Sequence, residues 1–510
     1  MDNWHSELAL TYHEETKHSY QSLRDDRHFL DWGNQPQPLK SYRGLQAIPL
    51  PAELPTTQMP ALRALAPLDP MAARTLPVTL PDLAYILFAA AGITRRRTYP
   101  GYGEMLFRAA ACTGALYHID LYIVTAEMPG LSAGVYHFDP RDFAVRQLRA
   151  GDYRQVLVEA SGDNPALRGA PVLIVGSDTF WRNTWKYRAR AYRHSFWDTG
   201  TILANLLAAA TARGLPAHLA LGFVDASVNA LLDIETPREV ALVLVGLGAG
   251  APPATMVPAM PALHLDVAPL SAEEHHYHAL EIIHAASALE APDEALEWRE
   301  VVATHGLPEA TGAIVPLAPT SVENLPPAVL EAVIRRRGSA RGFTSQALSL
   351  AQLSNVLVAA TQPIPADYLA TPRSRLNDLY CLIHAVEGVA FGSYVWHPPL
   401  QSLELLAAGA SRQEAGTLAL GQDLAEEASV LVFALCDLLP IVERLGNRGY
   451  RAAQLEAGLM GGRMYLAAYA QGLGATGLTF LDDDVTAYFA PHAAAKSVMF
   501  LLAMGYTARR

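Results

Sequence analysis

Apolar and polar residues follow one another along the chain in blocks that predict both helices and strands. Apolar residues recur at helical spacing over residues 80–92 and 198–214, whereas residues 116–126 and 239–248 are short apolar runs typical of buried strands. A glycine-containing turn leads into a further strand at residues 133–140. This mixture favours the α+β class, with an antiparallel or mixed sheet packed against helices.

The same pattern returns 258 residues later. Strands expected at 379–388, 392–399 and 497–506, and a helix expected at 456–472, repeat those of the first half. Many matched positions are glycines, which persist where the backbone needs a positive φ or a close approach. The offset therefore indicates an internal duplication. The repeated glycines are Gly130 and Gly388, Gly134 and Gly392, Gly151 and Gly409, Gly200 and Gly458, and Gly214 and Gly472.

The helix at 80–92 also repeats, but 270 residues later, at 350–361. The difference between the two offsets means that the first copy carries twelve extra residues around the segment RRRTYPGYGE at 95–104. We accordingly predict four parts. They are an N-terminal extension (1–60) that wraps the body, copy one (61–248), a Pro-, Ala- and Gly-rich linker (249–271) and copy two (272–510).

Composition narrows the function classes. The chain has 510 residues, 51% of them hydrophobic, and a net charge of −12, so it lacks the positive field that nucleic acids or anionic membranes require. Three widely separated cysteines argue against a disulfide framework or a zinc site, and we expect no bound metal. Because no secretory leader and no long apolar run occur, a cytoplasmic protein is expected.

The two copies differ most at a basic segment of copy two. Arg337, Ser339 and Arg341 form an R-x-S-x-R pattern that we expect at a helix start, where copy one has only PLDPM at 67–71. Two guanidiniums, a hydroxyl and helix N–H groups suit a terminal phosphate. A solvated basic helix start is the alternative interpretation.

Copy one has its own distinctive residues. Cys112, Thr113 and Gly114 precede a strand where copy two has bulky charged residues, and small residues let a flat ring approach the backbone. A simple tight loop is the alternative. Copy one also has Lys186-Tyr187, which can be either catalytic or part of a polar helix face.

Copy two in turn has a glycine-rich run containing Ala475, Thr476 and Gly477, whose backbone donors could meet a ring. The acidic triplet at 482–484 that follows is expected to be a solvent-facing turn.

These segments resemble the nitroreductase-like flavoproteins, and among them the SagB/ThcOx-type dehydrogenases. FRAAACTGALY resembles the family's R-x-x-P-S-x-G-A-L-Y stretch, RRGSAR its phosphate-binding segment, and WKYRARAYR a Lys-Tyr segment implicated in azoline oxidation. The resemblance covers essentially the whole chain. It departs from the family at Ala111-Cys112, which stands where Pro-Ser is usual, and a thiol is a weak donor.

The resemblance implies that FMN binds between two nitroreductase-like domains, which here would form an intrachain pseudo-dimer with one composite site. Arg337, Ser339 and Arg341 would hold the phosphate. Cys112, Thr113 and Gly114 from copy one, with Ala475, Thr476 and Gly477 from copy two, would approach the ring. The second, pseudo-equivalent site would have decayed. Lys186 and Tyr187 would be catalytic, with the Tyr187 phenol, acidified by Lys186, acting as the base.

Three functions are compatible with these features. The first is an FMN-dependent dehydrogenase acting on an azoline-type heterocycle in a peptide or on a small molecule. The second is an NAD(P)H-dependent nitro or quinone reductase. The third is a flavin-binding partner protein without turnover. The sequence leaves the oligomeric state of the chain open, a higher homo-oligomer included.

Overall fold

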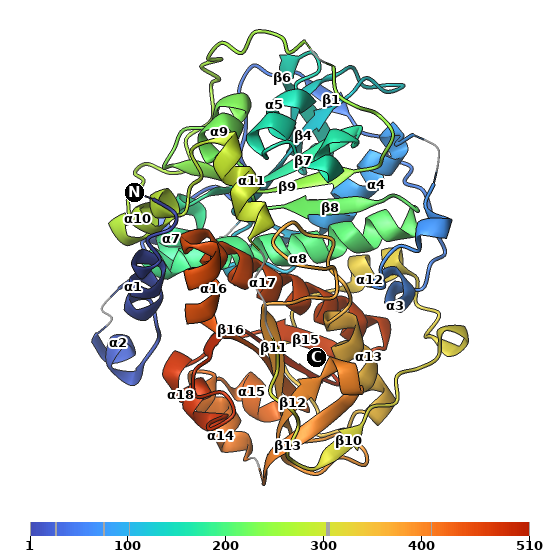
Figure 1. Cartoon of the computed structure of the whole chain (residues 1–510), viewed down its shortest axis with the longest axis vertical. Coiled ribbons are helices and arrows are strands. Elements are labelled where there is room, and N and C mark those ends of the chain that lie inside the picture. The colour runs from blue at the N-terminus through green and yellow to red at the C-terminus, as the bar shows by residue number, and fades with distance from the viewer. Residues whose placement is uncertain are drawn as a thin grey trace.

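The structure is a computed structural model that describes residues 2–25, 28–74, 77–100, 103–254, 256–301, 306–409 and 411–508. It contains two α+β domains, as the sequence predicts, and each has a seven-stranded sheet that is antiparallel throughout (Figure 1). Two long helices, α8 (Ala191–Ala212) and α17 (Asn447–Ala470), run side by side between the domains. Among the described residues, no helix has both the length and the apolarity that a membrane crossing needs.

The two sheets have the same strand order. In domain one it is β1 (Ala47–Pro49), β6 (Ala144–Ala150), β5 (Gly134–Asp139), β4 (Ile119–Thr125), β7 (Val172–Thr179), β9 (Glu239–Leu247) and β8 (Ala217–Ala220). In domain two it is β10 (Ile314–Pro316), β13 (Ser402–Ala408), β12 (Gly392–His397), β11 (Asn377–Ile383), β14 (Val430–Cys436), β16 (Ser497–Gly505) and β15 (Gly474–Gly477).

Helices cover these sheets in matching positions. In both copies the helix before the sheet's central strand starts with a capping box, in which the side chains of the first and fourth residues each accept the other's backbone N–H. Thr79 and Asp82 form it at α4 (Leu80–Ala91), and Ser349 and Gln352 form it at α13 (Leu350–Ala360). The twelve extra residues of copy one fall in the region of β2 (Ile93–Tyr99) and β3 (Gly103–Arg108), two strands that pair antiparallel.

The repeated glycines occupy positions that a side chain would strain. Three of the pairs have positive φ in both copies: Gly130 (90°) and Gly388 (75°), Gly151 (114°) and Gly409 (87°), and Gly214 (67°) and Gly472 (78°). Glycine alone adopts this region without steric cost, so these pairs mark turns that both copies share.

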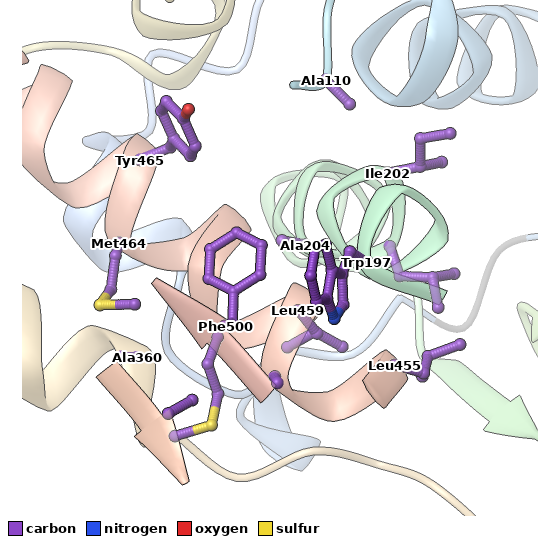
Figure 2. Close-up of a cluster of buried hydrophobic side chains, with 14 of the residues drawn as sticks. Ala110, Trp197, Ile202, Ala204, Ala360, Leu455, Leu459, Met464, Tyr465 and Phe500 are labelled. Carbon is purple, nitrogen blue, oxygen red and sulfur yellow. The ribbon is translucent and has the colours of Figure 1, made fainter. Parts of the chain in front are cut away.

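The interface between the domains is centred on the crossing of α8 and α17. Figure 2 shows Trp197 of α8 with Leu455 and Leu459 of α17 and Phe500 of β16 in this apolar cluster. The rings of Trp197 and Phe500 meet edge to face, with centroids 5.8 Å apart. Burial of such a cluster favours association of the two copies.

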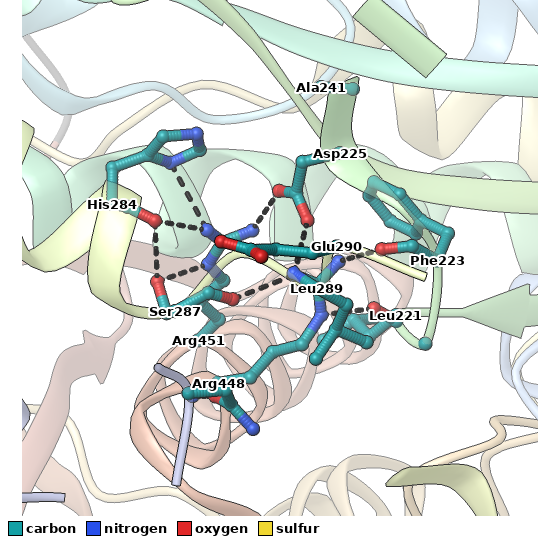
Figure 3. Close-up of polar contacts among 12 residues, drawn as sticks. Leu221, Phe223, Asp225, Ala241, His284, Ser287, Leu289, Glu290, Arg448 and Arg451 are labelled. Atoms are coloured by element: carbon teal, nitrogen blue, oxygen red, sulfur yellow. Dashed lines mark hydrogen bonds and ion pairs between the residues drawn. The ribbon is translucent and has the colours of Figure 1, made fainter. Parts of the chain in front are cut away.

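Two buried ion-pair networks flank the crossing. Asp225, at the start of α9 (Asp225–Leu232) in domain one, accepts hydrogen bonds from Arg448 (2.6 Å) and Arg451 (2.7 Å) of α17 (Figure 3). In the pseudo-equivalent place, Asp482 of domain two pairs with Arg190 (3.0 Å) and Arg193 (2.6 Å) of domain one. Each carboxylate therefore joins the two copies.

The same networks include two helices that the sequence did not predict to be related. Arg451 donates to the carbonyl of His284 and the hydroxyl of Ser287 at the end of α10 (His278–Ala286). Arg193 donates likewise to the His13 carbonyl and the Thr16 hydroxyl at the end of α1 (Glu7–Glu15). We therefore place α1 and α10 in the repeat, although their sequences share little beyond H-x-x-[S/T].

Four expectations from the sequence need correction. Asp482 is buried in an ion pair and does not face solvent. Strand β1 lies within the expected extension but is the counterpart of β10. Helices α8 and α17 begin at Ala191 and Asn447, about two turns before the expected starts, because their polar first turns are buried by the other domain. The R-x-S-x-R segment follows the end of α12 (Leu330–Arg336) and does not start a helix.

The remaining helices are short and lie around the two sheets. They are α2 (Tyr20–Asp25), α3 (Ala61–Ala64), α5 (Arg154–Ala160), α6 (Pro165–Arg168), α7 (Trp181–Tyr187), α11 (Pro292–Glu300), α14 (Arg412–Leu418), α15 (Asp423–Glu427), α16 (Leu438–Leu445) and α18 (Asp482–Tyr488).

Candidate functional site

The small-residue loop of copy one forms one wall of the candidate site. Cys112, Thr113 and Gly114 make a tight turn before β4, and Gly114 has a φ of 63°. Asp198 of α8 holds this turn: its carboxylate accepts from the Thr113 N–H (2.9 Å), the Thr113 hydroxyl (2.9 Å) and the Cys112 thiol (3.0 Å). The loop is thus fixed by a helix of the domain interface.

A buried histidine supports the same carboxylate. His118 lies between Asp178 and Asp198, with a ring nitrogen 2.8 Å from a carboxylate oxygen on each side. Burial alone would lower the pKa of His118, but the two carboxylates outweigh it and raise that pKa to about 9. The imidazolium therefore neutralises negative charge directly beneath the loop.

Lys186 and Tyr187 end α7 and lie at this loop. A methyl group added to Gly114 would come within 2.8 Å of the Tyr187 hydroxyl, so the phenol sits against the turn. Burial, Asp198 and Cys112 raise the pKa of Tyr187 well above its usual value. The Lys186 ammonium lies over the phenol ring, 5.2 Å from its centroid. The expectation that Lys186 acidifies Tyr187 is therefore wrong, because burial and neighbouring negative charge dominate.

Lys186 is the group whose basicity the surroundings weaken. Burial and the guanidinium of Arg341 both lower the pKa of Lys186. Among the described residues, no carboxylate lies within ion-pairing distance of the Lys186 ammonium. A lysine of domain one and an arginine of domain two thus place two positive charges near each other.

The basic segment of copy two reaches domain one by a second route. The Arg337 guanidinium donates to the carbonyls of Ala109 (2.8 Å), Arg108 (2.8 Å) and Ala110 (3.0 Å), immediately before the small-residue loop. This contact was not predicted, and it leaves only Nη1 of Arg337 without a hydrogen bond to these carbonyls. Ser339 and Arg341 are exposed beyond it.

The glycine-rich run of copy two is strand β15. Ala475 and Thr476 are buried in the sheet and Gly477 is exposed at its end. The Gly477 N–H donates to the Tyr465 hydroxyl, which also lies 3.4 Å from the Ser339 hydroxyl. Tyr465 of α17 therefore links two segments that the sequence assigned to the same site.

Asp198, His118 and Tyr465 were missed by the sequence-based prediction. A signal for Asp198 existed in the duplication, since Glu456 occupies its place in copy two. The Glu456 carboxylate accepts the N–H groups of Leu376 (2.7 Å) and Asn377 (2.8 Å) before β11. Both copies thus use an acid on the long interface helix to hold the loop before the central strand.

The residues present are compatible with a flat, phosphate-bearing cofactor. Arg337 and Arg341 of copy two offer guanidinium donors and Ser339 offers a hydroxyl, and these groups suit a phosphate. Because Gly114 has no side chain, the Tyr187 phenol lies directly against the turn and faces the segment predicted to flank the ring.

Comparisons with known proteins agree with the two-domain arrangement. A model of the nitroreductase family matches residues 74–249 and again residues 334–506. The crystal structure of a nitroreductase candidate from Anabaena variabilis superimposes with a TM-score of 0.76 and 26% identity, covering 98% of this chain and 99% of that one.

Two sequence relatives match about a third of the chain each. MJ1384, a nitroreductase candidate of Methanocaldococcus jannaschii, is 26% identical over 172 residues, which cover 34% of this chain and 81% of that protein. The trifolitoxin-processing protein TfxB of Rhizobium leguminosarum bv. trifolii is 29% identical over 170 residues, which cover 32% of this chain and 46% of that protein.

Proposed function

The chain belongs to the nitroreductase family, and on this premise we propose that it is an FMN-dependent oxidoreductase with one composite site between its domains. The observation that carries the proposal is the contact of Arg337 of domain two with the carbonyls of Arg108, Ala109 and Ala110 of domain one, directly before the small-residue loop. Arg341, Ser339 and the remaining Nη1 of Arg337 would hold the phosphate. Cys112, Thr113 and Gly114 would flank the ring from one side, and Ala475, Thr476 and Gly477 from the other.

Bound FMN would supply the two-electron redox chemistry of the site, and the protein would orient the reactants and manage protons. Lys186 is the better base, because its lowered pKa increases the neutral amine fraction near neutral pH. Tyr187 keeps its proton and would donate a hydrogen bond to the substrate. Asp198 and His118 would hold the loop in place without touching the reactants.

For the substrate we propose an azoline-type ring within a peptide, oxidised as in SagB/ThcOx-type dehydrogenases. The Lys-Tyr segment supports this assignment, and so does TfxB, a relative named for the processing of trifolitoxin. In this reaction Lys186 Nζ would accept the carbon-bound proton of the ring, and bound FMN would supply the two-electron oxidation. The product is an azole with two fewer hydrogens.

A second candidate is NAD(P)H-dependent reduction of nitro compounds or quinones, which the relation to MJ1384 favours. A third, a flavin-binding partner without turnover, is favoured by Cys112, whose thiol donates to Asp198 and is thereby directed away from a ring acceptor. The two enzymatic candidates share the composite site and differ in the second substrate.

The candidates separate in one set of assays on the purified full chain. Azoline-containing peptides are incubated with the FMN-loaded protein and oxygen, and mass spectrometry records the loss of two hydrogens. Bleaching of the flavin absorbance by NADPH followed by nitro-group reduction would instead favour the reductase. Bound FMN with neither reaction would favour the partner protein and contradict the dehydrogenase.

A further inference from the structure

A cavity of about 390 Å³ lies on the opposite side of the domain interface from the candidate flavin site. Its walls come from both domains: the end of α3 and the loop after it, one face of α8, the start of β8, and a proline-rich loop of domain two. This volume falls within the range of pockets that enclose small organic ligands, about 300–1,000 Å³.

The cavity is the pseudo-symmetric counterpart of the candidate flavin site. Leu207 lines it where copy two has Tyr465, and Ala217 lines it where copy two has Ala475. Pro372 stands at the place of Gly114, Pro67 at that of Arg337 and Leu68 at that of Gly338. The duplication therefore left a hollow at the position equivalent to the candidate flavin site, and the expected decay of the second site did not fill it.

The residues that line this cavity are more apolar than those of the candidate flavin site. Among the described residues that line the cavity, only Thr211 and Arg463 have polar side chains, and the others are alanines, leucines and prolines. The Arg463 guanidinium already donates to the carbonyls of Gln362 and Pro363. The residues equivalent to the phosphate-binding segment of copy two carry no cationic or hydroxyl group. Such a lining favours ligands that bury apolar surface, and it lacks the charged partners that a buried phosphate needs.

We propose that this cavity is a second ligand site, which takes a neutral, flat, apolar ring compound without a phosphate group. The equivalence to a flavin-binding position rests on the proposed function, whereas the cavity and its apolar lining do not. Arg463 would supply a hydrogen-bond donor at one end of the ligand. The two positions then bind different molecules: a phosphate-bearing cofactor at one and an apolar ring at the other.

The test uses N-phenyl-1-naphthylamine, a neutral compound whose fluorescence rises in apolar surroundings, with the full FMN-loaded chain. We expect saturable binding of one equivalent. 1-Naphthol should displace the probe and 1-naphthyl phosphate should do so at least tenfold more weakly. Absence of saturable binding, or equal competition by the phosphate ester, would overturn the proposal.

Variants of the lining residues test whether the probe binds in this cavity. Leu207→Trp fills the space and should weaken binding at least tenfold, as should Thr211→Trp at the half-buried rim, which guards against misfolding of the first variant. Leu207→Ala enlarges the cavity and should retain binding. Unchanged binding in the tryptophan variants would contradict the assignment. FMN content is measured on the same samples, so a failure of the flavin proposal shows as lost FMN with probe binding kept.

Discussion

Gly200 of α8 and Gly458 of α17 occupy the same place in the two copies and lie against each other where these helices cross. A methyl group on Gly200 would overlap the Leu459 nitrogen and lie 2.5 Å from the Leu455 carbonyl. One on Gly458 would lie 2.5 Å from the Trp197 carbonyl. The pseudo-twofold axis of the chain therefore passes near this pair, and the close crossing sets how the two domains meet.

Adding a methyl group at this crossing should destabilise the protein. Gly200→Ala and Gly458→Ala each force the helix backbones apart, and we expect a loss of about 3 kcal/mol in the free energy of unfolding for each. Urea unfolding followed by circular dichroism measures it. Gly169→Ala is the control, since nothing lies within 4 Å of an added methyl group there. A loss similar to that of the control would show that the crossing tolerates a wider separation.

Removing the charge of either buried aspartate should destabilise the interface between the two domains. In Asp225→Asn or Asp482→Asn, two arginines of the other copy remain buried without their carboxylate. We expect each variant to lose about 3–5 kcal/mol of unfolding free energy. The matched control is Asp483→Asn, at a side chain that is 71% exposed. Equal stability of Asp482→Asn and Asp483→Asn would contradict the assigned role of the network.

Alkaline pH should destabilise the protein through His118. Because its folded pKa is raised from about 6.5 to about 9, the stabilisation is fully present below pH 6.5 and is lost as the pH rises through 9. The size is on the order of 3 kcal/mol. Thermal unfolding between pH 6 and 10 should show this loss in the wild type and in His5→Gln, whose side chain is exposed. A His118→Gln variant with the same alkaline slope as the wild type would exclude His118 as its source.

The sequence predicted the parts of this fold that repeat and the residues that only one copy keeps. Gly130, Gly214 and their partners indicated shared turns, because glycine adopts positive φ without steric cost. The sequence did not reveal that α1 and α10 correspond. What these two helices share is a carbonyl and a hydroxyl at their ends that accept hydrogen bonds from an arginine. Many sequences can do that.

The site was predicted as a set of segments, and their contacts needed the structure. Asp198 holds the Cys112–Gly114 turn from a residue 85 positions away, a pairing that no local pattern encodes. The pKa of Tyr187 depends on burial and on Asp198. The adjacency of Lys186 in the sequence therefore did not predict the direction in which that pKa shifts.

Replacing Lys186 should separate proton transfer from cofactor binding. Lys186→Arg keeps the positive charge near Arg341 but cannot serve as a base at ordinary pH, so FMN content should stay near the wild-type level while turnover falls about 100-fold or more. Wild-type kcat should also decline as the pH drops and Lys186 becomes protonated. Tyr187→Phe should lower turnover less and leave this pH profile unshifted. Full activity in Lys186→Arg would remove Lys186 from the mechanism.

The composite site is tested most directly by the amount of FMN bound per chain, measured from flavin absorbance after release from the purified protein. We predict one FMN per chain in the wild type and at least a fivefold loss in Arg341→Ala. Met71→Ala, at the pseudo-equivalent position, is 92% exposed in the native chain and should retain full FMN. Two FMN molecules per chain, or full FMN in Arg341→Ala, would contradict a single site held by domain two.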